Sequence, residues 1–465
     1  MHRHFVPVMI VVAVAAPAAA NPDPRHLLPP DAVACAEVPA RPLTLPDLVD
    51  TALCANPATA VAYAASRSAA ANVGIARASE LPSVSASVGP TLSRTDYLSG
   101  QQFTTVTGQS FGATSRSTDL GSSASLALSY LLFDFGGRAA RTDAARASQR
   151  AALAQVADSA QSVALTTVTA YDSLLANNGA VAAARATVAF NRSSFDLADA
   201  KRRAGVSTPA DALQARTALA QAELTLRQAQ GNAATAAGQL AVAIGQPPTT
   251  VLALAPAPAL GAADVLTRDV ATLIADAERL RPDLATARAN RDSALAQVRA
   301  TRSDTRPSVG VNVQDNLGYA NSSTDSNRAS VGVTLSLPLF DGYSRTYRVA
   351  QARAEADRQA ALLEQTRQQA GLDVYTQATA LRTAIAVLAT ARELINSATA
   401  SADIAQGRFR AGVGTFTDLL NAQSALANAR QQLVSADFGV RDAQARLARA
   451  VGQIGDAVDG MRRGR

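Results

Sequence analysis

The strongest constraint in this 465-residue sequence is an internal repeat. Four short motifs of the N-terminal half recur in the same order in the C-terminal half, which makes the chain a tandem duplication. Equivalent residues are 225 positions apart from Pro57 to Pro282 and 207 apart from Phe133 to Phe340, so the first copy carries an 18-residue insertion after Pro82. The recurring motifs are Asn56-Pro57 with Arg281-Pro282, Leu81-Pro82-Ser83-Val84 with Arg306-Pro307-Ser308-Val309, Leu132-Phe133-Asp134 with Leu339-Phe340-Asp341, and Arg203-Ala204-Gly205-Val206 with Arg410-Ala411-Gly412-Val413.

Each copy contains two stretches in which apolar residues alternate with small polar ones. A period of two predicts strands with one apolar and one polar face. The links between these strands, 91–121 and 317–329, are rich in Ser, Thr, Gly and Asn and are predicted to be loops, the first of which holds the insertion. The apolar positions are Val84, Ala86 and Val88; Ala124, Leu126, Leu128, Tyr130 and Leu132; Val309, Val311 and Val313; and Val331, Val333, Leu335 and Leu337.

The longer segments repeat apolar residues every seven positions, which predicts helices packed as left-handed coiled coils. Residues 137–200 form one long predicted helix of about 96 Å, and the shorter predicted helices 57–81 and 209–245 together have a similar length. A soluble helical bundle has the same periodicity and remains an alternative at this point. The repeating positions are Thr167, Leu174, Val181, Val188 and Phe195; Val374, Leu381, Leu388, Ile395, Ala402 and Phe409; Leu219, Leu226, Ala233 and Leu240; and Leu426, Leu433, Val440 and Leu447.

Composition argues against most enzyme classes. Histidine occurs only at His2, His4 and His26, so almost no histidine is available for general acid–base catalysis or for a His-containing metal site. We therefore expect neither enzyme activity nor a cofactor or metal. Aromatic residues make up 4% of the chain against 48% apolar residues, which suits helices packed closely through alanine. The 43 basic residues are spread among 37 acids rather than clustered on one face, so we expect no nucleic-acid partner.

The N-terminus predicts export. Arg3, the apolar run 5–16 and the small residues 18–20 form a signal peptide, and no later segment is apolar enough for a transmembrane helix. Cys35 and Cys54 then predict a disulfide, with a lipidated Cys35 as the alternative. The expected organisation is a signal peptide at 1–20, an N-terminal segment at 21–56 with the disulfide, a first repeat at 57–245, an equatorial connector at 246–266, a second repeat at 267–452 and a tail at 453–465.

Four amphipathic strands are too few to close a membrane barrel, for which about eight is the usual minimum, whereas three chains would supply twelve. The duplicated strand ends at Phe133 and Phe340 and the duplicated turns at Gly205 and Gly412 resemble the TolC-type outer-membrane efflux family, over residues 43–452. The resemblance implies an α+β, mainly α fold. In it, the duplicated unit forms one third of a 12-stranded outer-membrane β-barrel, which a long α-helical coiled-coil barrel continues.

The resemblance also implies a function, as a homotrimeric channel of the outer membrane that extends into the periplasm. Its partners would be outer-membrane lipid, a periplasmic adaptor (membrane fusion protein) and an inner-membrane ABC or RND transporter, for type I protein secretion or multidrug efflux. Because Cys35 does not directly follow the expected cleavage site, the sequence favours the unlipidated, secretion-type branch. A periplasmic coiled-coil adaptor or a structural scaffold of an export complex is the alternative, although a scaffold leaves the alternating strands unexplained.

The candidate site lies just past the two turns. Asp418 and Asn421 are three residues apart on one helix face, and so are their copy-one equivalents, Asp211 and Gln214. In the plain interpretation, Asp211 and Asp418 are first-turn acids favoured by a helix N-terminus. The resemblance places Asp418 at the first, and Asn421 at the second, of two acidic positions that narrow the periplasmic entrance of the family.

The family's tip also carries an arginine and a tyrosine that brace the closed state. Those positions fall on Gly414 and Phe409 here, so the entrance is expected to be held less tightly. Three Asp418 carboxylates around one axis would attract divalent cations and raise one another's pKa. We therefore expect a cation-sensitive constriction with one charge per subunit.

Overall fold

The structure, a computed structural model, describes residues 41–97, 102–104, 110–112, 115–255, 269–320 and 326–455. The expected signal peptide and Cys35 lie outside these residues, so the disulfide between Cys35 and Cys54 stays a prediction. Part of the expected connector at 246–266 and most of the tail at 453–465 lie outside them as well.

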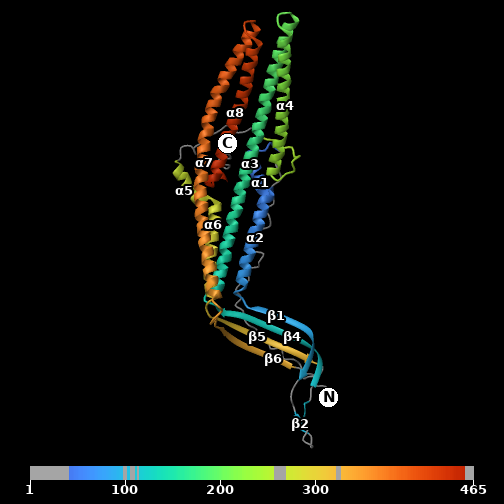
Figure 1. The fold of residues 1–465 in the computed structure, drawn as a ribbon, viewed down its shortest axis with the longest axis vertical. Coiled ribbons are helices and arrows are strands. Elements are labelled where there is room, and N and C mark those ends of the chain that lie inside the picture. Colours follow the sequence, from blue (N-terminus) through green and yellow to red (C-terminus); the bar gives the residue numbers. More distant parts are fainter. Residues whose placement is uncertain are drawn as a thin grey trace. The chain divides into compact units, whose positions relative to one another are not determined.

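The chain divides into two compact units. The first contains Arg67–Arg146 and Leu295–Ala352, and the second contains Ala147–Ala294, Arg353–Arg465 and the segment that ends at Ser66. Along the chain the elements are α1 (Leu45–Ala55), α2 (Pro57–Ala78), β1 (Ser83–Tyr97), β2 (Gln102–Thr104), β3 (Ser110–Gly112), β4 (Ser115–Phe133), α3 (Gly137–Arg203), α4 (Pro209–Ala243), α5 (Val270–Leu280), α6 (Pro282–Ser303), β5 (Ser308–Ala320), β6 (Ser326–Ser336), α7 (Ser344–Arg410) and α8 (Phe416–Val451), as labelled in Figure 1.

The first unit is built on one antiparallel sheet. Its strands pair in the order β1–β4–β5–β6, so the two strands of each copy are neighbours and the copies meet between β4 and β5 (Figure 1). The predicted strand pairs are therefore confirmed. Within the described residues, β1 and β6 each pair on one side only.

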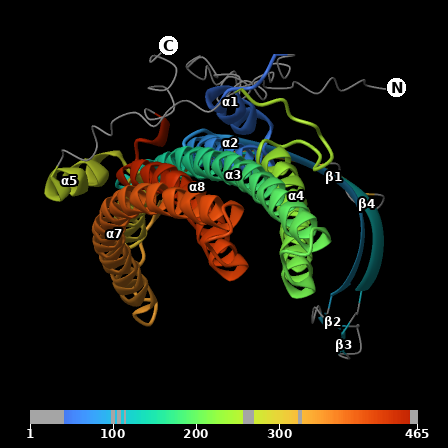
Figure 2. The ribbon, with the colours of Figure 1, turned by 90° about the horizontal axis from the view of Figure 1, so that it is seen from above.

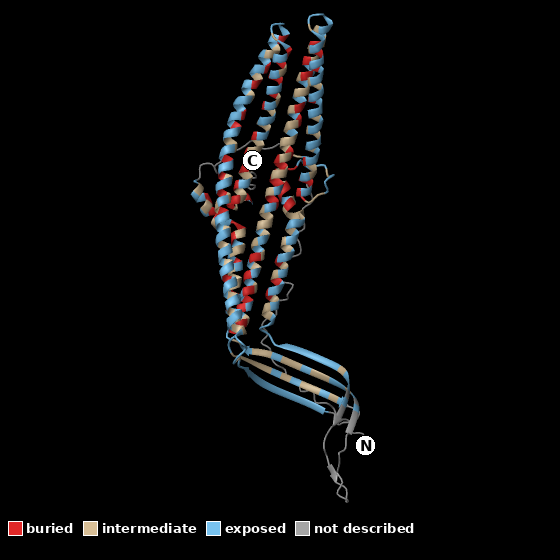
Figure 3. Ribbon diagram, viewed as in Figure 1, coloured by how far each residue is buried: buried red, intermediate tan, exposed pale blue. Residues whose placement is uncertain are grey.

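The two faces of this sheet differ in polarity, as the alternation predicts. No described strand residue is buried (Figure 3), so the apolar face is exposed in the single chain, and such a face marks an interaction surface. Asp315, which lies between Leu126 and Ala329, interrupts it. One apolar row crosses all four strands as Val84, Leu128, Val313 and Val331, and the polar row beside it is Ser83, Ser129, Asn312 and Gly332.

The prediction that 91–121 and 317–329 are loops is partly wrong. Backbone pairing between β1 and β4 continues from Thr91 opposite Gly121 to Tyr97 opposite Ser115, and β2 and β3 form a short hairpin within the insertion. β5 likewise continues to Ala320. The ladder bonds are made by the backbone, so a run of Ser and Thr does not end a strand.

The second unit is helical. α7, α8, α3 and α4 lie side by side in a curved layer, in that order (Figure 2). The helices α3 and α7 have 67 residues each, which confirms long equivalent helices in the two copies. Predicted heptad positions are buried in both, including Leu174, Val181, Val374, Leu381 and Leu388.

Alanine forms much of the helical core. Between α7 and α8 one cluster consists of Ala398, Ala402, Ala422, Leu426 and Ala429, and all of these residues are buried. Small side chains allow the helix backbones to approach closely, as the composition predicts.

The two copies end their last helices in the same way. Gly245 after α4 and Gly452 after α8 have positive φ angles of 77° and 87°. A Cβ atom at Gly245 would lie 2.5 Å from the carbonyl oxygen of Ala55, and one at Gly452 would lie 3.0 Å from the carbonyl carbon of Leu280. Glycine is required at both positions by conformation and by space.

A polar contact repeats beside these glycines. Asn56 Nδ2 donates to the carbonyl oxygen of Ala243 at 2.9 Å, and Arg281, its equivalent, donates from Nη1 to the carbonyl oxygen of Ala450 at 3.3 Å. Both acceptors belong to helix C-termini whose last carbonyls lack partners within the helix. The duplication has therefore kept the contact and changed the donor.

The first described residues contact the chain between the copies. Leu43 donates from its backbone nitrogen to the carbonyl oxygen of Ala253 at 2.8 Å and accepts from Ala255 at 2.9 Å, which makes a short parallel bridge.

Of the helices that the structure describes, none combines the length and the hydropathy needed to cross a bilayer.

Candidate functional site

The two tip turns have the same backbone geometry. Gly205 between α3 and α4 and Gly412 between α7 and α8 have φ angles of 72° and 75°. In the first turn, Val206 donates its backbone N–H to the carbonyl oxygen of Lys201 at 3.0 Å, and in the second, Val413 donates to Arg408 at the same distance. A left-handed glycine with this hydrogen bond is the Schellman ending of a helix, so the turns follow from local sequence.

Asp211 and Asp418 begin α4 and α8 in equivalent capping boxes. The backbone nitrogen of Asp418 donates to Thr415 Oγ1 at 3.1 Å, and Thr415 donates back to the Asp418 carboxylate at 3.3 Å. Asp211 makes the same reciprocal pair with Thr208, at 3.3 Å in both directions. The structure thus places both acids in the plain role expected of first-turn residues.

The capping bonds also set the charge of these acids. Hydrogen bonds from Thr415 lower the pKa of Asp418, which is fully exposed. The hydroxyl of Ser207, 2.6 Å away, lowers the pKa of Asp211. Both carboxylates are therefore negative at neutral pH. Gln214 and Asn421 follow one turn later and are exposed.

Phe409 and Gly414, the two positions at which a bracing pair was expected to be missing, are closely packed in the tip. Phe409 is buried with Phe416 and Leu419, and its ring centroid lies 5.6 Å from that of Phe416. A Cβ atom at Gly414 would lie 3.0 Å from the Cβ of Arg408, so the turn closes tightly against α7. Sequence reasoning identified these positions but not the apolar cluster around them.

Lys201 is a tip residue that the sequence reasoning missed. Its ammonium group lies 4.2 Å from the centroid of the Phe409 ring and donates a hydrogen bond to the carbonyl oxygen of Phe409. The available signal was its rarity, because Lys201 is the only lysine in the chain.

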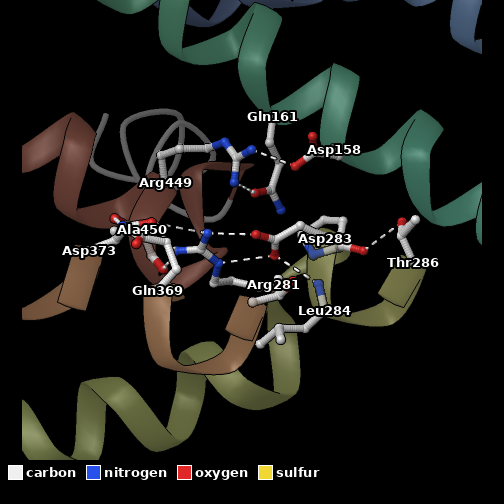
Figure 4. Close-up of polar contacts among 12 residues, drawn as sticks. Asp158, Gln161, Arg281, Asp283, Leu284, Thr286, Gln369, Asp373, Arg449 and Ala450 are labelled. Atoms are coloured by element: carbon white, nitrogen blue, oxygen red, sulfur yellow. Dashed lines mark hydrogen bonds and ion pairs between the residues drawn. The ribbon is translucent and has the colours of Figure 1, made fainter. Parts of the chain in front are cut away.

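A second polar cluster joins α5, α6, α7 and α8 (Figure 4). The buried Arg281 donates to Asp283 at 2.6 Å, and to Asp373 and the carbonyl oxygen of Ala450 at 3.3 Å each. Burial opposes ionisation, but the hydrogen bonds and the charge of Arg281 lower the pKa of Asp283. The cluster is satisfied internally and holds the α5–α6 junction against the end of α8.

Arg449 connects the same end of α8 to α3 (Figure 4). Its guanidinium lies 2.5 Å from Asp158 and 3.2 Å from Gln161, and Gln161 in turn donates to the carbonyl oxygen of Gly452 at 2.9 Å. These bonds join the first copy to the second.

Asp172 is a buried acid of α3 that sequence reasoning also missed. Burial raises its pKa to about 7. The positive charge of Arg441 lowers this pKa, and the negative charges of Asp442 and Asp437 raise it further. An acid inside an alanine-rich helix carries no local mark of burial, so only the packing of α3 against its neighbours identifies it.

A cavity of about 820 Å³ lies between α3, α4 and α8. Its lining is made of alanine, leucine, amide and hydroxyl side chains, without a charged residue, and includes Gln214 and Gln423. Within the part of the chain that the structure describes, no group of three His, Cys, Asp or Glu residues is arranged to hold a metal ion.

Comparisons with known proteins agree with this architecture. Residues 48–246 and 273–453 match the family described as Outer membrane efflux protein. Protein CyaE of Bordetella pertussis (strain Tohama I) is 32% identical over 432 residues, which cover 90% of this chain and 86% of that protein.

Solved outer-membrane proteins share the fold. The CmeC outer membrane channel of Campylobacter jejuni superposes with a TM-score of 0.76 at 19% identity, over 88% of this chain and 86% of that one. The outer membrane protein VceC of Vibrio cholerae gives 0.70 at 21% identity, over 88% and 96%.

These matches bear on the expected function class. The matched family is one of efflux proteins, and the matched structures include a channel, which is in keeping with the expectation that the chain is not an enzyme. With the duplicated strand pairs, the long helices and the family match over both copies, the chain belongs to the outer membrane efflux protein family and is a protein of the outer membrane.

Proposed function

We propose that three copies of this chain form a channel-tunnel that carries substrates across the periplasm and the outer membrane. The observation that carries the proposal is the four-stranded sheet with one exposed apolar face and with β1 and β6 paired on one side only. Unpaired strand edges are costly in lipid, and a closed barrel removes them. Four strands from each of three chains make a 12-stranded barrel, above the minimum of about eight.

The helices then form the wall of the periplasmic passage. The cavity between α3, α4 and α8 has no charged side chain in its lining that would select one kind of substrate. Selection would rest with an inner-membrane ABC or RND transporter, joined through a periplasmic adaptor. The proposed task is type I protein secretion or multidrug efflux. A periplasmic adaptor or scaffold is disfavoured, because neither would need an exposed apolar sheet face.

The tip residues are proposed as the periplasmic gate. Asp418 is exposed and charged, so three copies around an axis would form a ring of carboxylates, with Asn421 one turn deeper. The carboxylate of Asp211 accepts hydrogen bonds from Ser207 and Thr208, and Asp211 is less exposed than Asp418. Asp418 is therefore the proposed cation-binding member, and Asp211 and Gln214 have the secondary role.

Mass measurement in mild detergent tests the assembly. We expect three copies of the mature chain, and channel activity in planar lipid bilayers from the same preparation. A stably folded monomer, with the helix content of the native protein by circular dichroism, would contradict the shared barrel.

A further inference from the structure

The apolar face of the sheet ends in exposed aromatic rings. Phe133 lies opposite Val309, next to the pair of Tyr130 and Val311 on the same face. Three positions along a strand normally reverse the face, but the bulge between Leu131 and Phe133 restores it. Phe133 is 53% exposed at this end of the sheet.

An aromatic pair extends this end of the face. The ring of Phe135 meets that of Phe133 edge-on, with centroids 4.7 Å apart, and Phe135 itself is 44% exposed. In the second copy, Phe340 and Tyr343 form a similar pair at 5.7 Å, and both are exposed. Each copy therefore places two aromatic side chains at or shortly after the end of its second strand.

Arginines lie against the copy-one rings. The guanidinium carbon of Arg306 is 5.4 Å from the centroid of Phe135, and that of Arg138 is 5.9 Å from the centroid of Tyr130. Arg138 is mostly buried and lies 3.5 Å from the carboxylate of Asp134. Arg306 is exposed and has no carboxylate partner among the residues that the structure describes.

Two other nearby arginines have carboxylate partners. Arg141 forms an ion pair with Asp304, and Arg345 lies 3.6 Å from Asp341. Arg306 has no such partner among the described residues and lies against the Phe135 ring. Because its guanidinium stacks on Phe135, it is positioned beside the apolar face and remains accessible to an anion.

Exposed aromatic rings next to arginine are typical of the level where a membrane protein meets lipid headgroups. A guanidinium binds phosphate oxygens by paired, charge-assisted hydrogen bonds. We propose that Arg306, held against Phe135, binds the phosphate of a phospholipid headgroup whose acyl chains lie on the apolar face beside Phe133. The proposal uses the outer-membrane location and does not depend on the number of subunits.

The duplication predicts how many such sites each chain has. The equivalent of Arg306 in the first copy is Leu81, and the equivalent of Phe135 in the second copy is Gly342. The charge and the ring are therefore missing from these two equivalent positions, although Phe340 and Tyr343 lie close by in the second copy. One phosphate site per chain follows, rather than one per copy.

Native mass spectrometry of the detergent-purified protein, titrated with phosphatidylglycerol, tests this inference. We expect one tightly retained lipid per chain and about ten-fold weaker retention in Arg306→Ala, which corresponds to about 1.4 kcal/mol. Arg306→Lys should be intermediate, because it keeps the charge but loses the paired hydrogen bonds of the guanidinium. The matched control is Arg328→Ala, which removes an exposed arginine opposite Asn316, away from the Ser308–Ser336 end of the sheet, and should change nothing. Equal loss in both alanine variants would show general electrostatic attraction and overturn the site.

Two further ligands separate the possible sources of phosphate. Diacylglycerol with the same acyl chains should bind the wild type as weakly as phosphatidylglycerol binds Arg306→Ala. Inorganic phosphate at the same concentration should not displace the lipid, because it has no acyl chains to pack on the apolar face. Full displacement by inorganic phosphate would mean a free-anion site and overturn the lipid assignment.

Discussion

The ammonium group of Lys201, near the end of α3, lies 4.2 Å from the centre of the Phe409 ring, near the end of α7. The same group donates to the carbonyl oxygen of Phe409. One side chain of the first copy therefore joins a helix end of the second. This contact lies at the proposed gate.

Removing this charge should loosen the tip. We expect Lys201→Met to raise the ratio of open to closed channel about ten-fold. A cation–π contact and a charged hydrogen bond together contribute about 2–4 kcal/mol, and hydration of the groups that lose these contacts offsets part of that loss. Single-channel recording in planar bilayers measures the ratio. The control Arg202→Met removes a neighbouring exposed charge that is paired with Asp199 and should leave gating unchanged. Identical gating in wild type and Lys201→Met would remove this contact from the gate.

Because Lys201 is the only lysine, amine-reactive reagents provide an independent check. Acylation should modify Lys201 and the N-terminal amine alone, and it should open the channel as Lys201→Met does. Acylated Lys201→Met protein controls for the N-terminal amine.

Asp418 should control block by divalent cations. Three exposed carboxylates around one axis attract such ions, so Asp418→Ala should relieve block by Mg²⁺ added on the periplasmic side of a planar bilayer. Asp211→Ala should have a smaller effect, because Ser207 and Thr208 already engage that carboxylate. Equal block in wild type and Asp418→Ala would exclude Asp418 from the constriction.

Asp172 should make the stability of the helical unit depend on pH. Burial raises its pKa from 3.8 to about 7, so the folded state binds more protons than the unfolded state between these values. The stabilisation by the protonated acid is complete below the unfolded pKa and is lost as the pH rises through about 7. Thermal unfolding by circular dichroism should show wild type losing stability from pH 5 to pH 8, and Asp172→Asn losing less. The exposed acid Asp357, changed to Asn, should leave the wild-type profile intact.

The two faces of β6 should tolerate charge differently. Val331 lies on the apolar face and is 75% exposed, so Val331→Arg should destabilise the membrane-inserted form by about 2–4 kcal/mol near the bilayer midplane. Ser330→Arg, on the polar face one residue away, should cost much less. Folding yields in lipid vesicles measure the difference, and equal yields would contradict the assignment of the lipid-facing side.

Local periodicity accounts for what the sequence predicts well. Heptad positions such as Val374 and Leu381 mark buried seams because a seven-residue repeat fixes one helix face. The turns at Gly205 and Gly412 follow from a residue type that tolerates positive φ. Strand alternation likewise separates the apolar and polar faces of the sheet.

Contacts between distant segments are what the sequence does not reveal. Lys201 and Phe409 are 208 positions apart, and their contact depends on how two helical hairpins pack. The burial of Asp172 has the same origin. Extension of β1 to Tyr97 was missed because backbone pairing, rather than side-chain polarity, decides where that strand ends.

The alanine seam between α7 and α8 also determines how these helices can move. Apart from Leu426, the buried residues of this cluster are alanines such as Ala398, Ala402 and Ala429, so few large side chains must be repacked when one helix moves along the other. A small sliding or rolling displacement exchanges one methyl contact for a similar one at little cost, which is the condition for shear between packed helices. In the proposed channel, the helices could therefore adjust the width of the passage without local unfolding.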